Sequence, residues 1–250
     1  MRYFIKIKYK GTQYHGWQIQ ANATSIQAVL SLALSQILRE DISLSGSGRT
    51  DTGVHALQQY AHFDTTRTLN LQEHMHKFNA LLPHDISIQE ILPVKDEAHS
   101  RFDAYQRSYQ YHIHQHKDPF LHEFSYLFRP ELDLDRMNLS ATWLVTGKER
   151  DYACFSKSRS SQETSLCRID HAEWVRIDPY RLVFHITANR FLRNMVRAIV
   201  GTMLDIGTHK MSHGGFEAIL HSKDRKKAGR SVPAQGLYLS QVNYPGEIFL

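Results

Sequence analysis

Two stretches of the chain, residues 2–10 and 104–116, limit what it can fold into, because apolar and polar side chains alternate along both. In "RYFIKIKYK", the first of them, every second residue is apolar. Successive side chains of a strand point to opposite faces, so this pattern is typical of a strand with one buried face. Such a strand needs a covering layer, and each is followed by a segment with helical spacing, residues 24–38 and 133–147.

Further segments extend the pattern along the chain. Four short runs are predicted as strands and one long run as a helix: residues 42–45, 58–65, 171–178 and 181–188, and residues 190–207. We expect the first helix to begin with Thr24 as N-cap and Gln27 completing a capping box. This pattern of elements predicts an α+β protein of two similar halves, residues 1–104 and 105–250, with largely antiparallel sheets flanked by helices.

The charge balance favours a polyanionic partner. Net charge is +5 with histidines neutral, and basic residues gather in residues 221–230 and around Lys157 and Arg159. No run reaches the roughly 18 apolar residues of a membrane-spanning helix. Two cysteines, Cys154 and Cys167, are too few for a disulfide framework or a zinc site. We therefore expect a cytoplasmic protein with reduced thiols and no membrane contact.

Residues 46–56, "GSGRTDTGVHA", place three glycines around Arg49, Asp51 and His55. Their spacing fits neither a dinucleotide fingerprint nor a P-loop, in which Lys and Ser/Thr follow the last glycine. The sequence also lacks a serine nucleophile on a strand-to-helix elbow. What remains is Asp51, interpreted either as a functional carboxylate raised at a loop tip or as an Asp that caps its own turn.

A second candidate lies in "NRFLRNMVRAIVG", residues 189–201. In a helix, Arg190, Arg193 and Arg197 share a stripe at the border of a wide apolar arc. A partly desolvated guanidinium needs an anion, either a protein carboxylate or a nucleic-acid phosphate. The alternative, preferred for two of the three arginines, is that the stems pack on apolar surface while the charged heads reach water.

Three histidines, His112, His114 and His116, alternate on one predicted strand and so share a face. His-x-His on a strand chelates zinc when a further ligand is supplied, which makes a metal-dependent hydrolase an alternative function. The sequence has no HExxH or carboxylate-rich partner motif. We therefore favour histidines that face water while Tyr111 and Ile113 face the core, and we expect no metal.

Five stretches carry a resemblance to a known family. They are "GRTDTGVHA", "YKGTQYHGWQIQ" (residues 9–20), "HSRFDAYQRSYQY" (residues 99–111), "NRFLRNMVRAIVG" and "AQGLYL". Taken in their order along the chain, they resemble the motifs of the TruA-type tRNA pseudouridine synthase family over nearly the whole chain, and "GRTDTGVHA" looks like its catalytic loop. Lys10, Thr52 and "DYACF" (residues 151–155) depart from the usual motifs. None of these departures touches Asp51, Tyr109 or Arg197.

The resemblance implies an enzyme that isomerises uridine to pseudouridine at positions 38, 39 and 40 of the tRNA anticodon stem-loop, by base flipping and without a cofactor. It implies Asp51 as the catalytic carboxylate, paired with Arg197. Tyr109 would stack on the flipped uracil, and Arg49 would contact a phosphate or act as a wedge. It also implies a homodimer whose similar halves flank a basic catalytic cleft. A non-catalytic RNA-binding module and a synthase acting at other RNA positions are the alternatives.

Overall fold

The computed structural model describes residues 1–157 and 164–250, so Arg159 of the Ser-rich stretch lies outside the described residues. The chain divides into two compact units. Unit 1 comprises Met1–Gln106 and Tyr238–Leu250, and unit 2 comprises Arg107–Leu237. The sequence set a boundary near residue 104 and assigned residues 105–250 to one half. In the structure the last segment of the chain belongs to unit 1.

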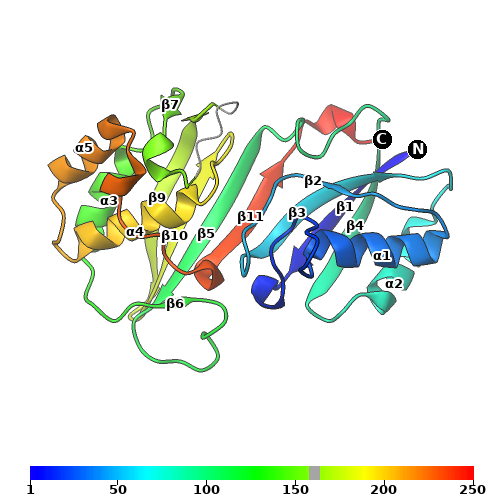
Figure 1. Ribbon diagram of the computed structural model, residues 1–250, viewed down its shortest axis with the longest axis horizontal. Coiled ribbons are helices and arrows are strands. Elements are labelled where there is room, and N and C mark those ends of the chain that lie inside the picture. The colour runs from blue at the N-terminus through cyan, green and yellow to red at the C-terminus, as the bar shows by residue number, and fades with distance from the viewer. Residues whose placement is uncertain (158–163) are drawn as a thin grey trace. The chain divides into compact units, whose positions relative to one another are not determined.

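Unit 1 is a sheet with helices on one face (Figure 1). Its elements are β1 (Arg2–Tyr9), α1 (Ile26–Leu38), β2 (Ser45–Gly46), β3 (His55–Asp64), α2 (Leu71–Leu81), β4 (Ile86–Val94) and β11 (Leu237–Asn243), with single 3₁₀ turns at Gly11–Gln13 and Gly246–Ile248. The strand order is β4-β1-β3-β11, with β2 also on β3. Strands β4, β1 and β3 run antiparallel, whereas β11 is parallel to β3.

Both faces of β1 are covered. The alternating residues predicted to face the core are buried, and so is Phe4 on the opposite face. The ring of Phe4 meets Tyr244 and Phe249 edge-on, with ring centres 5.3 and 6.2 Å apart. Aromatic residues of the C-terminal segment therefore seal the face of β1 that the helices leave open.

Helix α1 begins one residue later than the sequence predicted. The N-cap is Ser25, whose hydroxyl accepts the Ala28 N–H at 3.3 Å, so the assignment to Thr24 is wrong. The capping box is wrong as well, because Gln27 turns its amide toward the Leu44 carbonyl, 2.7 Å away. A buried amide gains more from that long-range partner than from a helix end already capped by a serine.

Unit 2 repeats the arrangement of an antiparallel sheet with helices on one face (Figure 1). Its elements are β5 (Gln106–His114), β6 (Tyr126–Leu127), α3 (Leu134–Thr142), β7 (Arg150–Asp151), β8 (Leu166–Cys167), β9 (Ile169–Asp178), β10 (Arg181–Ala188), α4 (Met195–Gly207) and α5 (His213–Ser222), with 3₁₀ turns at Ala153–Phe155, Arg225–Lys227 and Ala234–Gly236. The strands β5, β10 and β9 pair antiparallel in that order. The predicted α+β class with largely antiparallel sheets is confirmed.

The long helix predicted over residues 190–207 is shorter in the structure. It begins at Met195, because Asn194 has a left-handed backbone with φ 64° and cannot continue a right-handed helix. Arg190 and Arg193 therefore precede the helix, and the predicted stripe of three arginines is wrong. Of the three, Arg197 alone lies in α4.

Two further expectations concern membranes and thiols. Within residues 1–157 and 164–250, none of the helices combines the length and the apolar character needed to cross a bilayer. Cys154 and Cys167 are both buried and not joined in a disulfide. Burial raises the pKa of the Cys154 thiol to about 12 and that of the Cys167 thiol to about 11.

Candidate active site

The carboxylate of Asp51 stands on a tight turn in unit 1. The Val54 N–H donates to the Asp51 carbonyl at 3.1 Å, which closes a four-residue turn over Asp51–Val54. Gly53, the third residue, has φ 79°. A type II turn requires such a positive φ at this position, and glycine supplies it without strain. Asp51 thus uses its backbone to begin the turn and leaves its side chain partly exposed.

Residues 14–17 pack against this turn and form hydrogen bonds with it. Gly16 has φ 83°, and a Cβ atom there would lie 2.3 Å from the Thr50 carbonyl oxygen. The Trp17 N–H donates to that oxygen at 3.2 Å, and the Gly53 N–H donates to the Tyr14 carbonyl at 3.3 Å. The peptide that joins Thr50 to Asp51 is therefore fixed by close packing and by hydrogen bonds on both sides.

Side chains complete the support. The hydroxyl groups of Tyr9 and Thr50 form a buried hydrogen bond of 2.9 Å. The Gly11 N–H donates to Nδ1 of His55 at 3.1 Å, and the His55 ring stacks on Tyr238 with centres 4.7 Å apart. His55 is buried, so this histidine holds the base of the loop. The sequence placed His55 beside Asp51 but did not show this structural role.

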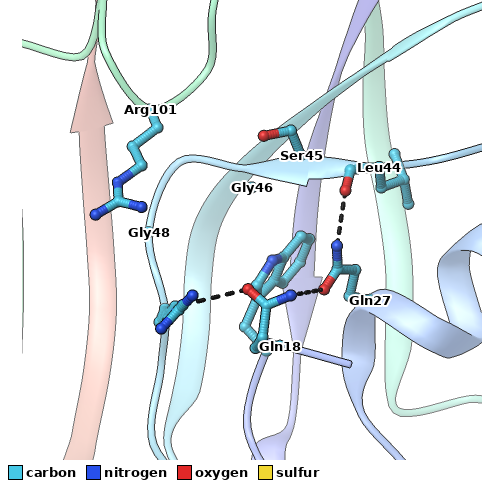
Figure 2. A pocket seen from close by; sticks show the side chains of 9 residues that line it. Gln18, Gln27, Leu44, Ser45, Gly46, Gly48 and Arg101 are labelled. Carbon is cyan, nitrogen blue, oxygen red and sulfur yellow. Dashed lines mark hydrogen bonds between the residues drawn. The ribbon is translucent and has the colours of Figure 1, made fainter. Parts of the chain in front are cut away.

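A cavity of about 150 Å³ adjoins the first half of the loop (Figure 2). It is lined by Trp17, Gln18, Gln27, Leu44, Ser45, Gly46, Gly48, Arg49 and Arg101. Arg49 Nε donates to Gln18 Oε1 at 3.2 Å. The cavity therefore takes in Arg49, one of the predicted site residues, together with Arg101, which the sequence did not single out. The Arg-Phe pair inside "HSRFDAYQRSYQY" was the signal that could have identified it.

Two predicted site residues, Tyr109 and Arg197, belong to unit 2. Tyr109 is partly exposed on β5, and its ring meets Phe191 edge-on with centres 5.1 Å apart. Arg197, in the first turn of α4, donates from Nε to the Val232 carbonyl at 2.7 Å. Tyr109 is thus positioned by a strand, and Arg197 by the beginning of a helix.

Tyr111 is a buried residue of the same strand, β5. The Tyr111 hydroxyl donates to the Pro233 carbonyl at 2.8 Å. Burial raises the pKa of Tyr111 well above its usual value, and the positive charge of Arg197 acts in the opposite direction. Tyr111 shares a face of β5 with Tyr109, since the two are separated by one residue. The segment after Gly229 therefore packs against both β5 and the start of α4.

The three histidines of the metal hypothesis do not share one environment. His116 follows the end of β5 and is exposed, His112 is partly buried, and His114 is buried. Desolvation lowers the pKa of His114. Across the residues that the structure describes, no group of three His, Cys, Asp or Glu side chains is arranged to hold a metal ion. The expectation that the histidines face water is wrong for His114.

Comparison with known proteins gives consistent matches over nearly the whole chain. A family model described as tRNA pseudouridine synthase matches residues 5–103 and 147–245. A protein of Bacteroides fragilis named tRNA pseudouridine synthase A is 47% identical over 99% of this chain and 98% of its own length. Proteins with the same name are 46% identical in Bacteroides thetaiotaomicron, over 99% and 92% of the two chains, and 39% identical in Caldicellulosiruptor saccharolyticus, over 96% and 98%.

Proposed function

The chain belongs to the tRNA pseudouridine synthase family, as its motifs predicted, and from this we propose that it isomerises uridine to pseudouridine in tRNA. The uridines are those at positions 38, 39 and 40 of the anticodon stem-loop. Because these positions are neighbours and the surrounding sequence differs from one tRNA to the next, we expect the protein to recognise the shape and the backbone of the RNA. The protein acts in the cytoplasm as a homodimer. The net charge of +5 supports a polyanionic substrate.

The reaction breaks the C1′–N1 glycosidic bond, turns the uracil within the site and joins C1′ to C5. The hydrogen at C5 leaves as a proton, and N1 takes up a proton, so the product is an isomer of the substrate. Neither an electron acceptor nor a transferred group is needed, which is why we propose a mechanism without cofactor or metal. A carboxylate suits this chemistry, either on the sugar as in glycoside cleavage or on the base as a nucleophile.

Asp51 is the proposed catalytic carboxylate. The observation that carries this assignment is the support beneath its turn, where Gly16, Trp17 and Tyr14 hold the peptide backbone on both sides of the aspartate. A reacting group must be held to within a fraction of an ångström of its productive position, and rigid backbone achieves this. An Asp that served only to close a surface turn would not need such support.

The other site residues have proposed roles with the substrate. Tyr109 stacks on the uracil after it leaves the helix, and its partly exposed ring on a strand suits that role. Arg197 provides a positive charge that pairs with the carboxylate of Asp51 and orients it during the reaction. Arg49 contacts the RNA backbone near the flipped nucleotide.

The test compares wild type with Asp51→Asn on tRNA carrying tritium at uracil C5. We expect wild type to release tritium and form pseudouridine, and the variant to release none while it keeps its thermal stability and its tRNA affinity. Equal release by both proteins would refute the role of Asp51. Tight, salt-dependent binding by wild type without release would instead indicate a non-catalytic RNA-binding protein. Sequencing the modified tRNA then shows which positions carry pseudouridine.

A further inference from the structure

We propose that the cavity beside the loop binds one phosphate group of the RNA backbone through Arg49 and Arg101. This subsite, called here the phosphate cavity, comprises the nine lining residues given above and does not include Asp51. The proposal rests on the proposed function in that its ligand is part of the RNA substrate. It assigns the contact to a phosphate of the RNA backbone rather than to the reacting uracil itself.

The size and the charge of the phosphate cavity point to a small anion. Its volume of about 150 Å³ is half or less of the roughly 300 to 1,000 Å³ typical of sites for whole small molecules. Two arginines line it, and none of the described residues that line it is acidic. A planar guanidinium binds phosphate oxygens through paired N–H groups, so two of them around one cavity favour a phosphate.

Arg49 is oriented by a chain of amide side chains. Its Nε donates to Gln18 Oε1 at 3.2 Å, and Gln18 Nε2 donates to Gln27 Oε1 at 3.0 Å. Gln27 Nε2 in turn donates to the Leu44 carbonyl at 2.7 Å, and Gln27 is buried. The first of these contacts uses Nε of Arg49 and orients its guanidinium, and the other two hold Gln18 in position. A guanidinium held in this way loses little entropy when it binds an anion.

Arg101 comes from a segment that is equally well held. The Arg101 N–H donates to Nδ1 of His99 at 3.1 Å, and the His99 N–H donates to Asp103 Oδ2 at 2.8 Å. The Ser100 hydroxyl donates to the Ser45 carbonyl at 2.7 Å, while the Ser100 carbonyl accepts the Tyr244 hydroxyl at 2.5 Å. These contacts hold the backbone of the turn that carries Arg101.

Figure 2 shows the Arg101 side chain reaching from its turn toward the segment that carries Gly48. The opposite wall is shaped by glycine, because a Cβ atom on Gly46 would lie 2.4 Å from the indole of Trp17. The Gly48 carbonyl accepts Gln59 Nε2 at 3.0 Å, which keeps this segment in place. Both walls of the phosphate cavity are thus ordered without a ligand, which lowers the entropy lost on binding.

The test measures tRNA affinity of the full chain by fluorescence anisotropy between about 50 and 200 mM salt. For Arg101→Ala we expect affinity to fall about tenfold or more at low salt, and the slope of log K against log salt to shrink by about 1. Arg101→Lys, which keeps the charge but not the fork, retains the slope. Lys95→Ala is the charge-matched control, since Lys95 is exposed in the same unit and does not line the cavity.

Two further arms test whether both arginines hold the same phosphate. Arg49→Ala and Arg101→Ala combined are expected to cost less affinity than the sum of the single changes. Single methylphosphonate substitutions along the anticodon arm remove one phosphate charge at a time. For wild type, the substitution of one particular phosphate should lower the affinity. For Arg101→Ala, the same substitution should leave the affinity as it is for unmodified tRNA.

The outcomes separate this proposal from the proposed function. If Arg101→Ala matches Lys95→Ala in affinity and slope, or if its loss is spread over every phosphate, the phosphate cavity is not a subsite, even where pseudouridine forms normally. If wild type forms no pseudouridine yet shows the arginine-dependent phosphate, the cavity stands and the catalytic assignment fails. A saturating-tRNA rate of Arg101→Ala equal to that of wild type would show that Arg101 acts in binding alone.

Discussion

Gly16 and Thr50 lie so close together that no side chain fits between them. A Cβ atom on Gly16 would lie 2.3 Å from the Thr50 carbonyl oxygen and 3.1 Å from the carbonyl carbon of Asp51. The first contact is with backbone rather than with a flexible side chain, so the loop itself would have to move. The glycine in "YHGWQ" is therefore required by the position of the aspartate in a different motif.

Gly16→Ala is expected to lower both stability and activity. The positive φ of 83° and the clash together should cost at least about 2 kcal/mol in the free energy of unfolding. Displacement of the Asp51 backbone should slow pseudouridine formation about 100-fold. Urea unfolding and single-turnover kinetics measure the two effects. Gly246→Ala, where no atom lies within 4 Å of the new Cβ, is the control, and equal behaviour of the two variants would contradict the close packing.

The buried hydrogen bond between Tyr9 and Thr50 gives a second prediction. Tyr9→Phe leaves the Thr50 hydroxyl without this partner, and Thr50→Val does the reverse, so each should cost about 1 to 2 kcal/mol. Because both single variants strand a buried polar group, the double variant should cost less than their sum. Chemical denaturation of all four proteins measures this coupling. Strict additivity would show that the two hydroxyls do not depend on one another.

Stability should fall below neutral pH because of His62. Burial and the neighbouring charges of His99 and Arg2 lower the pKa of His62 to about 4, while its unfolded value is about 6.5. Between these values the unfolded chain binds the extra proton, so stability rises with pH and is lost as pH drops from about 6.5 to 4. We expect His62 to account for a loss of about 2 kcal/mol.

The ring nitrogen explains the effect, since Nδ1 of His62 accepts the Ser100 N–H at 3.2 Å and cannot do so when protonated. Unfolding curves for wild type and His62→Asn at a series of pH values isolate its share, because all other histidines remain in both proteins. The variant should be less stable at pH 7 and lose less on acidification. Parallel pH profiles would show that other groups cause the acid sensitivity.

Two helical glycines should respond to alanine in opposite directions. At Gly201 in α4, a Cβ atom would lie 1.7 Å from the Arg230 carbonyl oxygen, so Gly201→Ala should destabilise by about 2 kcal/mol or more. At Gly214 in α5 the nearest such atom is a side-chain oxygen 4.0 Å away, and Gly214→Ala should stabilise by up to about 1 kcal/mol. Thermal unfolding compares them, and two changes of the same sign would contradict the prediction.

Sequence periodicity predicted the regular elements well where apolar and polar residues largely alternate, as in β1, β9 and β10. It missed β4, because a bulge sets Gln89 out of register between the pairs Ile7↔Ile88 and Lys6↔Glu90. The buried side chains of β4 consequently follow one another at spacings of two and then three residues. Helix α2 was missed for another reason, since it buries Phe78 alone and so shows almost no apolar stripe.

The candidate site was predictable in its chemistry but not in its support. The loop motif drew attention to Asp51 and Arg49 because a carboxylate and a guanidinium among glycines are conspicuous in sequence. The partners that fix them, such as Gly16 beneath Thr50 or Gln27 behind Gln18, are ordinary residue types far from the loop in sequence. Long-range contacts of this kind leave no periodic signal. Arg101 was not predicted because the role proposed for it depends on the cavity beside it, which the sequence does not show.

The return of the last strand has a consequence for the synthesis of the protein. Strand β11 pairs with β3 through Tyr238↔His55 and Leu239↔Ala56, next to the loop that carries Asp51. The ribosome makes all of unit 2 before it makes this strand. A growing chain can therefore fold unit 2 while the aspartate loop still lacks its neighbour, and the loop is completed only when residues 238–250 emerge.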